Sequence, residues 1–138
     1  MAITIAVLSQ KGGTGKTTTV RTLTDAFRRS GLRVLAVDLD PQGNLSDYFD
    51  LDPEASPTIG DVLAGRATAR EAVHDDVIPA NLSLAEAELM LAGKMGRELT
   101  LRRARELLLP LREEARRHNA VTRGAALALA AIRKKGLD

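Results

Sequence analysis

The chain has 138 residues, of which 44% are hydrophobic and 28% charged, and its formal net charge is +2. That length is sufficient for one globular domain with its own core. The absence of cysteine excludes disulfides, thiolate metal sites and iron–sulfur clusters. The sequence shows no secretion signal and no apolar run of the roughly 18 residues that a membrane span requires. We therefore expect a cytoplasmic protein.

The first predicted elements surround a glycine-rich stretch. Residues 3–8 are apolar and β-branched, which favours a buried parallel strand. Apolar residues then recur at helical spacing over 20–27, and residues 33–37 form a second short apolar run. Between the first strand and the helix stands Q-K-G-G-T-G-K-T-T, residues 10–18. This order predicts an α/β fold with a mostly parallel sheet and helices on both faces.

The glycine-rich stretch indicates a phosphate-binding site. Glycines leave backbone N–H groups unobstructed, and the start of a helix adds further unpaired N–H groups. Lys16 is expected to reach the β- and γ-phosphates of ATP, and the Thr17 hydroxyl to ligate Mg²⁺. The alternative is a plain loop with two surface lysines, which does not explain the strand–loop–helix context. The predicted nucleotide contacts are Lys11, Gly12, Gly13, Thr14, Gly15, Lys16, Thr17 and Thr18.

The spacing departs from the usual phosphate loop. The pattern G-x-x-x-x-G-K-[ST] would need glycine where the chain has Gln10. The stretch K-G-G-T-G-K-T instead resembles the deviant Walker A loop of the ParA/MinD-type ATPases. The resemblance implies that Lys11 reaches across an ATP-dependent homodimer to the partner's phosphates. It also implies an ATP-hydrolysing switch for plasmid or chromosome partitioning, which binds DNA non-specifically and responds to a ParB-like partner.

Two aspartates follow the second predicted strand, in D-L-D-P-Q-G-N, residues 38–44. Pro41 and Gly43 indicate a loop, and loops at the carboxyl ends of parallel strands face the ligand crevice. This string also resembles the ParA family. The resemblance implies that Asp40 positions the attacking water, and Asp38 is assigned to orienting the Mg²⁺ shell. The alternative, that both aspartates only end a strand and begin a turn, stays open.

Three further elements are predicted in the middle of the chain. Residues 58–65 read as a short helix that follows a proline-containing loop. Residues 81–84 read as a short strand. The pattern Ser83-x-x-Glu86 predicts a capping box for a helix that ends near Gly93.

The last part of the chain is predicted to be helical and basic. Residues 97–108 are helical by composition, and the alanine-rich residues 120–135 favour a helix through intrinsic propensity. The excess of basic residues there is consistent with DNA contact, but no aromatic residues interleave for base stacking, so solvated helix faces are favoured. No membrane binding is expected, because alanine buries little area in lipid.

The resemblance to the ParA family breaks after about residue 109. The family continues with a strand that ends in the Walker B aspartate, whereas residues 111–118 contain no apolar run ending in aspartate and nothing later supplies one. We therefore assign residues 1–110 to the N-terminal part of a ParA-like ATPase domain and residues 111–138 to a divergent helical basic tail. The missing carboxylate, which helps to hold Mg²⁺, leaves catalysis undecided. The alternatives are a truncated nucleotide-binding module without turnover, or an inactive fragment that docks onto an intact relative.

Overall fold

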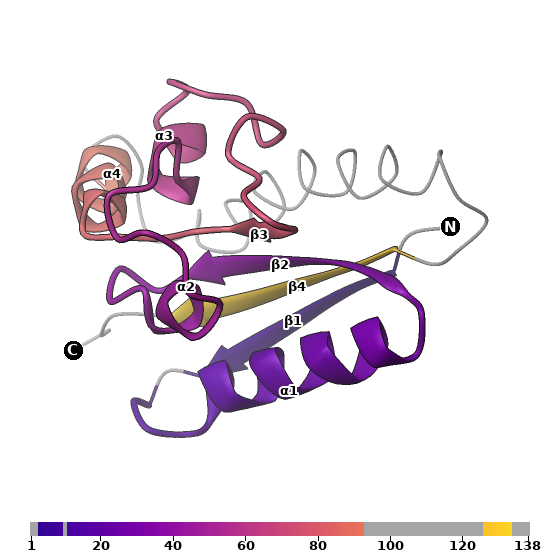
Figure 1. Ribbon diagram of the computed structural model, residues 1–138. Helices are drawn as coiled ribbons and strands as arrows, with labels where there is room; N and C mark the ends of the chain where they lie inside the picture. The colour runs from indigo at the N-terminus through magenta and orange to yellow at the C-terminus, as the bar shows by residue number, and fades with distance from the viewer. Residues whose placement is uncertain (1–2, 10, 93–125, 134–138) are drawn as a thin grey trace.

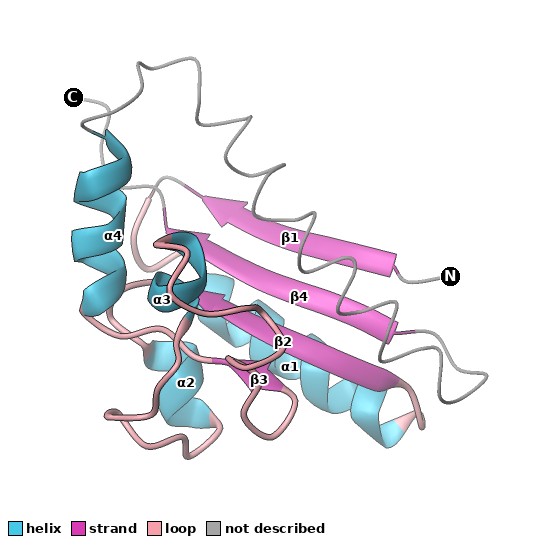
Figure 2. Cartoon of the chain, turned by 90° about the horizontal axis from the view of Figure 1, so that it is seen from above, coloured by secondary structure: helices cyan, strands magenta, loops and turns pink. Residues whose placement is uncertain are grey.

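A parallel sheet forms the centre of the fold. The computed structural model describes residues 3–9, 11–92 and 126–133. Its strands are β1 (Ile3–Ser9), β2 (Arg33–Leu39), β3 (Val77–Ile78) and β4 (Ala126–Arg133). They pair in the order β1-β4-β2-β3, and every pairing is parallel (Figures 1 and 2). The predicted α/β class is therefore confirmed.

Helices cover both faces of this sheet. They are α1 (Lys16–Arg29), α2 (Asn44–Tyr48), α3 (Ile59–Leu63) and α4 (Ser83–Ala92). Helix α1 lies on one face, and α3 and α4 lie on the other (Figure 1). No helix in the described part of the chain is long and apolar enough to cross a membrane.

Strand β2 supplies the core on both faces, because successive side chains of a strand point to opposite sides. Val34 and Ala36 pack with Val20 of α1 and Leu45 of α2. The alternate residues of β2 pack with α3, α4 and β3, in a cluster that includes Leu35, Val37, Leu39, Ile59, Ile78 and Leu84. All of these side chains are buried. Strand β2 is thus fixed from both sides, and so is the loop that leaves its carboxyl end.

The helix predicted from the periodicity of residues 20–27 is confirmed as α1. It ends at Arg29, and Gly31 follows with φ of 78°, a conformation that favours glycine. The Leu32 N–H donates to the Phe27 carbonyl at 3.0 Å, which closes the helix end. The chain then enters β2 directly.

The prediction of a helix over residues 120–135 is wrong for residues 126–133, which form β4. This strand lies between β1 and β2 and pairs with both, with Ser9 opposite Arg133 and Leu39 opposite Ile132. Helix propensity is a weak preference that tertiary contacts override. In a central strand the backbone forms hydrogen bonds on both edges, and here this pairing outweighs the helix propensity of the alanine-rich segment. The helix predicted over 97–108 and the domain boundary at residue 110 lie outside the described residues.

The region before α4 also differs from its prediction. Residues 81–84 do not form a strand; the strand here is β3, at Val77–Ile78. Ser83 is the first residue of α4 instead of its cap. The Asn81 side chain caps the helix, because its Oδ1 accepts hydrogen bonds from the Ser83 N–H at 3.0 Å and the Ser83 hydroxyl at 2.6 Å. The predicted helix end near Gly93 lies outside the described residues, and α4 is described as far as Ala92.

The short helix predicted over 58–65 is confirmed as α3, and a carboxylate fixes its start. Asp61 Oδ2 accepts hydrogen bonds from the Thr58 N–H at 2.8 Å and the Thr58 hydroxyl at 3.2 Å. Arg66 adds an ion pair to Asp61 at 2.9 Å. The bond from the Thr58 N–H is the main reason that the pKa of Asp61 lies below its ordinary value of 3.8.

Asp61→Asn should destabilise the fold by roughly 0.5–2 kcal/mol at neutral pH, the usual cost of a lost helix cap. Because the pKa of Asp61 is lowered by folding, the ionised carboxylate stabilises the fold above the unfolded pKa, and this contribution is lost as the pH falls through the folded pKa. Urea unfolding from about pH 7 down to about pH 3 should therefore show the two proteins converging in acid. Glu54→Gln, an exposed carboxylate on a loop, is the control. A difference that stays constant down to the lowest pH would contradict the assignment.

Ala130→Pro tests the central position of β4. Proline has no N–H and would break a ladder that pairs Ala130 with Ala6 on one side and Val37 on the other. We expect a loss of about 3 kcal/mol or more in urea unfolding, whereas Ala130→Gly, which keeps the N–H, should cost only about 1 kcal/mol. Equal effects of the two substitutions would argue against β4 as a central strand.

Candidate functional site

The loop between β1 and α1 has the open backbone that the sequence predicts. Gly13 and Gly15 have φ of 70° and 82°, in the left-handed region that favours glycine. A Cβ built on either residue would meet nothing within 4 Å, so open space lies beside both. Thr14 Oγ1 donates to the Lys11 carbonyl at 3.2 Å, which closes the loop on itself. The result is a compact turn with an unobstructed backbone.

Two predicted site residues, Lys11 and Lys16, meet in this loop. Lys16 Nζ donates to the carbonyl oxygen of Lys11 at 3.1 Å, so the ammonium group returns to the start of the loop. Lys11 itself bonds through its backbone, since its N–H donates to Ser9 Oγ at 3.3 Å. Among the described residues, the Lys11 ammonium has no hydrogen-bond partner, and the residue is exposed. One lysine is therefore bonded to the loop backbone, and the other is exposed.

The loop leads into the N-terminus of α1. The Thr19 N–H donates to the Gly15 carbonyl at 2.8 Å, which is the first bond of the helical ladder. The N–H groups of Lys16, Thr17 and Thr18 therefore precede the first intrahelical hydrogen bond. Together with the dipole of a 14-residue helix, they form a positive end suited to an anion. Thr17, half-buried in this turn, brings a hydroxyl to the same end.

The second loop of the site leaves β2 at the same edge of the sheet, because β1, β4 and β2 run in parallel (Figure 1). Asp40 lies at its start and is 9% exposed. Its Oδ1 accepts a hydrogen bond from the Gln42 N–H at 3.0 Å, and its carbonyl accepts one from the Gly43 N–H at 2.9 Å. Within the described residues, no hydrogen bond or ion pair joins either lysine of the first loop to either aspartate of the second.

Asp38 is fully buried and has three hydrogen-bond donors around its carboxylate. Oδ1 accepts from the Asp40 N–H at 3.0 Å, and Oδ2 accepts from the Ser46 N–H at 3.0 Å and the Ser46 hydroxyl at 2.8 Å. Desolvation by burial raises the pKa of Asp38 above 3.8, and these hydrogen bonds act in the opposite direction. The carboxylate thus holds the loop from Asp40 to Ser46 in shape, a task that its assignment to the Mg²⁺ shell did not anticipate.

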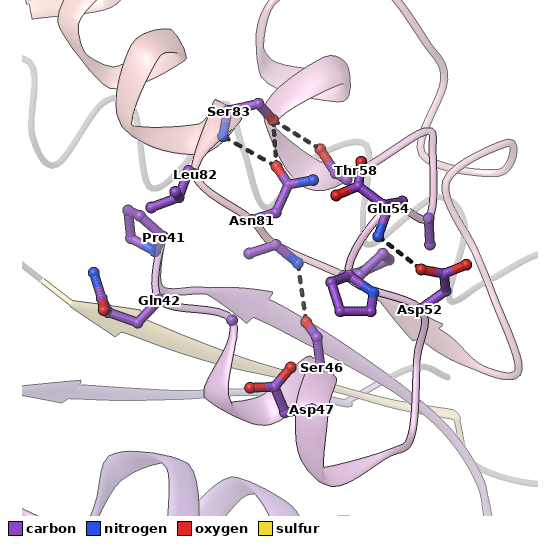
Figure 3. Close-up of a pocket in the computed structure, with 15 residues that line it drawn as sticks. Pro41, Gln42, Ser46, Asp47, Asp52, Glu54, Thr58, Asn81, Leu82 and Ser83 are labelled. Atoms are coloured by element: carbon purple, nitrogen blue, oxygen red, sulfur yellow. Dashed lines mark hydrogen bonds between the residues drawn. The ribbon is translucent and has the colours of Figure 1, made fainter.

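An open pocket of about 590 Å³ lies beside this second loop (Figure 3). Three segments line the pocket: the second loop, residues 52–58 and the segment before α4. The lining residues are Pro41, Gln42, Gly43, Ser46, Asp47, Asp52, Pro53, Glu54, Ala55, Thr58, Pro79, Ala80, Asn81, Leu82 and Ser83. None of the predicted nucleotide contacts of residues 11–18 lies in this lining. The sequence interpretation missed the pocket, because its walls come from three segments that meet only in the folded chain.

At Gly43 the second loop lies in close contact with the segment before α4. The φ of Gly43 is 68°, and a Cβ there would lie 2.9 Å from the Ala80 carbonyl oxygen. Any side chain would therefore push the second loop away from the segment before α4. The glycine of D-P-Q-G-N is thus required by contact as well as by backbone conformation.

Comparisons with known proteins agree with this fold. A family model described as an AAA domain matches residues 2–113. The chromosome partitioning protein ParA of Caulobacter vibrioides is 39% identical over 111 residues, in a match that covers 75% of this chain and 42% of that protein. The crystal structure of cobyrinic acid a,c-diamide synthase from Mycobacterium smegmatis, with bound ATP analogue and magnesium, is 35% identical with a TM-score of 0.69; the match covers 94% of this chain and 50% of that one.

A third relative is the septum site-determining protein MinD of Pyrococcus horikoshii, in complex with Mg-ADP. It is 26% identical with a TM-score of 0.59, and the match covers 100% of this chain and 51% of that one. The chain thus spans about half the length of these relatives. The family model covers most of the chain, and the chain therefore belongs to this AAA-domain family, as a relative of the ParA/MinD-type P-loop ATPases.

Proposed function

We propose that residues 11–18 bind ATP with Mg²⁺ and that the chain acts as an ATP-dependent switch of the ParA type. The observation that carries this proposal is the contact of Lys16 Nζ with the Lys11 carbonyl, in a loop that has two glycines with positive φ. A cation bonded to a glycine loop that leads into a helix N-terminus is an arrangement that suits phosphate oxygens. The relatives solved with an ATP analogue or ADP and magnesium support the same ligand.

Each residue of the first loop then has a defined task. The amides at the start of α1 contact the phosphates, and Lys16 exchanges the Lys11 carbonyl for the β- and γ-phosphate oxygens. The Thr17 hydroxyl is the ligand for Mg²⁺, which typically takes one or two protein ligands beside phosphates and water. When bound, Mg²⁺ neutralises charge that develops on the phosphates. The donor set fits, because the nucleotide itself supplies most of the oxygen ligands.

In the second loop, Asp40 is proposed to orient the attacking water. Its Oδ1 bond to the Gln42 N–H fixes the carboxylate against its own loop and leaves further acceptor capacity on both oxygens. The Mg²⁺ role of Asp38 would need its oxygens to give up donors from Asp40 and Ser46. We therefore favour Thr17 over Asp38 as the metal ligand and assign to Asp38 the support of the Asp40 loop.

Lys11 is proposed to act on the phosphates of a second copy of the chain. Its ammonium is exposed and has no hydrogen-bond partner among the described residues, while its backbone alone makes the contacts that shape the loop. A charge presented in this way is available to an ATP-dependent dimer, as an arginine finger is in other phosphoryl-transfer enzymes. Partitioning of a plasmid or chromosome in the cytoplasm, with non-specific DNA and a ParB-like protein as partners, is the role proposed from the likeness to ParA.

A nucleotide-binding module without turnover is the second candidate. Strand β4, which lies between the strands that lead to the two loops, ends at Arg133 and not at an acidic residue. Within residues 3–9, 11–92 and 126–133, no cluster of three acidic or histidine side chains is placed to hold a metal ion. A weaker hold on Mg²⁺ would preserve binding but slow hydrolysis.

Lys16→Ala should weaken ATP binding by about 10- to 100-fold, because it removes a charge-assisted contact of roughly 1.5–3 kcal/mol. Isothermal titration with Mg·ATP measures this effect. Arg70→Ala removes one exposed positive charge elsewhere and serves as the control. Unchanged ATP affinity in the Lys16 variant would refute the proposed site.

Phosphate release distinguishes the two candidate functions. An ATPase should release phosphate at a rate that disappears in Lys16→Ala, whereas a module without turnover should bind ATP and release nothing above background. A colorimetric phosphate assay on the purified chain makes this comparison. Release that persists in the Lys16 variant would point to a contaminating enzyme and would contradict the first candidate.

Lys11→Ala should leave ATP affinity within about twofold of the parent, because the side chain makes no contact within its own loop. It should abolish ATP-dependent dimerisation, which multi-angle light scattering after size-exclusion chromatography detects. Arg70→Ala is again the matched loss of charge. The same ATP-induced dimer in the Lys11 variant would show that this lysine does not act across an interface.

A further inference from the structure

Ser46 lies at the centre of a buried polar chain that the proposed catalytic roles do not include. Its side chain is 5% exposed, and its hydroxyl donates to Asp38 Oδ2 at 2.8 Å. Ser46 Oγ in turn accepts a hydrogen bond from the Ala80 N–H at 3.1 Å (Figure 3). One hydroxyl therefore joins the end of β2, the first turn of α2 and the segment that follows β3.

The chain of bonds continues to the proposed catalytic aspartate. Asp38 Oδ1 accepts from the Asp40 N–H, and the Asp40 carboxylate and carbonyl accept from Gln42 and Gly43 in turn. The path from Asp40 through Asp38 and Ser46 to Ala80 consists of direct hydrogen bonds no longer than 3.1 Å. No step depends on a side chain that reaches across solvent.

Van der Waals contact reinforces this path. Gly43 lies so close to Ala80 that a Cβ would come within 2.9 Å of its carbonyl oxygen. The second loop and the segment before α4 therefore touch at Gly43 and are hydrogen-bonded at Ser46. Movement of one segment away from the other would break the bond from the Ala80 N–H to Ser46 Oγ and leave this buried amide without its acceptor.

Serine is chemically suited to this position. The hydroxyl donates one hydrogen bond and accepts another at the same atom. Alanine would remove both bonds, and threonine would keep both. The raised pKa of Asp38 is consistent with a carboxylate that is desolvated and dependent on these donors.

We propose that Ser46 is a positioning residue, which couples the Asp40 loop to residues 79–83 so that the two segments open and close as one unit. The inference deepens the proposed function, since the loop that it holds is the one proposed to orient the attacking water. The coupling would also link the pocket of Figure 3 to the Asp40 loop, because both coupled segments line this pocket. A group that enters the pocket and displaces Ala80 would displace Asp40 as well.

Native-state hydrogen exchange on the unmodified chain provides the first test. The amides of Gln42, Gly43, Ser46 and Ala80 donate within this network. If the segments open together, these amides should share one opening free energy and should shift together when Mg·ATP is added. Clearly different opening free energies for Gly43 and Ala80 would overturn the proposal, and this measurement requires neither a variant nor turnover.

Ser46→Ala provides the second test. In this variant the amides of Gln42, Gly43 and Ala80 should exchange at least fivefold faster than in the parent chain. The Kd for Mg·ATP should stay within about twofold of the parent value, and phosphate release should fall at least tenfold. Ser46→Thr should restore both exchange and release. Ser30→Ala removes a hydroxyl that bonds only the Ala26 carbonyl within α1, and it should change nothing.

The outcomes of these tests separate the inference from the proposed function. Faster exchange at Ala80 alone, with Gln42 and Gly43 unchanged, would show a local bond and overturn the coupling. Equal losses in ATP affinity and release would show a general structural role and would also overturn it. If the parent chain binds ATP but releases no phosphate, the ATPase proposal fails, and the exchange data still decide the role of Ser46.

Discussion

The parallel pairing of β1, β4 and β2 is the constraint on which the site depends. Parallel strands bring their carboxyl ends to one edge, so the glycine loop after β1 and the aspartate loop after β2 emerge at the same edge of the sheet, with β4 between them. The two loops are more than twenty residues apart in the chain and share no hydrogen bond within the described residues. Their common location is therefore a property of the sheet, which has the two lysines in the loop after β1 and the two carboxylates at the end of β2.

Burial of Asp38 is the second determinant of the site. A carboxylate at the end of an apolar central strand is unfavourable unless donors surround it. Here the donors are the Asp40 N–H, the Ser46 N–H and the Ser46 hydroxyl. The hydrogen bonds to this one buried carboxylate therefore fix the conformation of the second loop. The exposed loop of Lys11 and Lys16 has no comparable anchor, and its form depends on glycine conformation and on the Lys11 carbonyl.

Local patterns in the sequence were sufficient to predict β1, α1, β2, α3 and the glycine-rich loop between β1 and α1. In these segments periodicity, glycine placement and turn chemistry all favour the structure that forms. The alanine-rich residues 126–133 misled the prediction, because their helix propensity is outweighed by pairing on both edges of a central strand. Ser46 and the pocket were missed for a related reason, because each joins the loop after β2 to the segment after β3, and no short stretch of sequence encodes that contact. The Asn81 cap is local, since it bonds Ser83 two residues away, and it was missed because Ser83 was itself interpreted as the cap.

The central claim is that the loop of residues 11–18 receives a triphosphate. A crystal structure of the full chain with a non-hydrolysable ATP analogue and Mg²⁺ tests it most directly. The account predicts phosphate oxygens against the amides at the start of α1 and Lys16 Nζ moved from the Lys11 carbonyl to the phosphates. Nucleotide bound elsewhere, or Lys16 still on that carbonyl at saturating ligand, would contradict it.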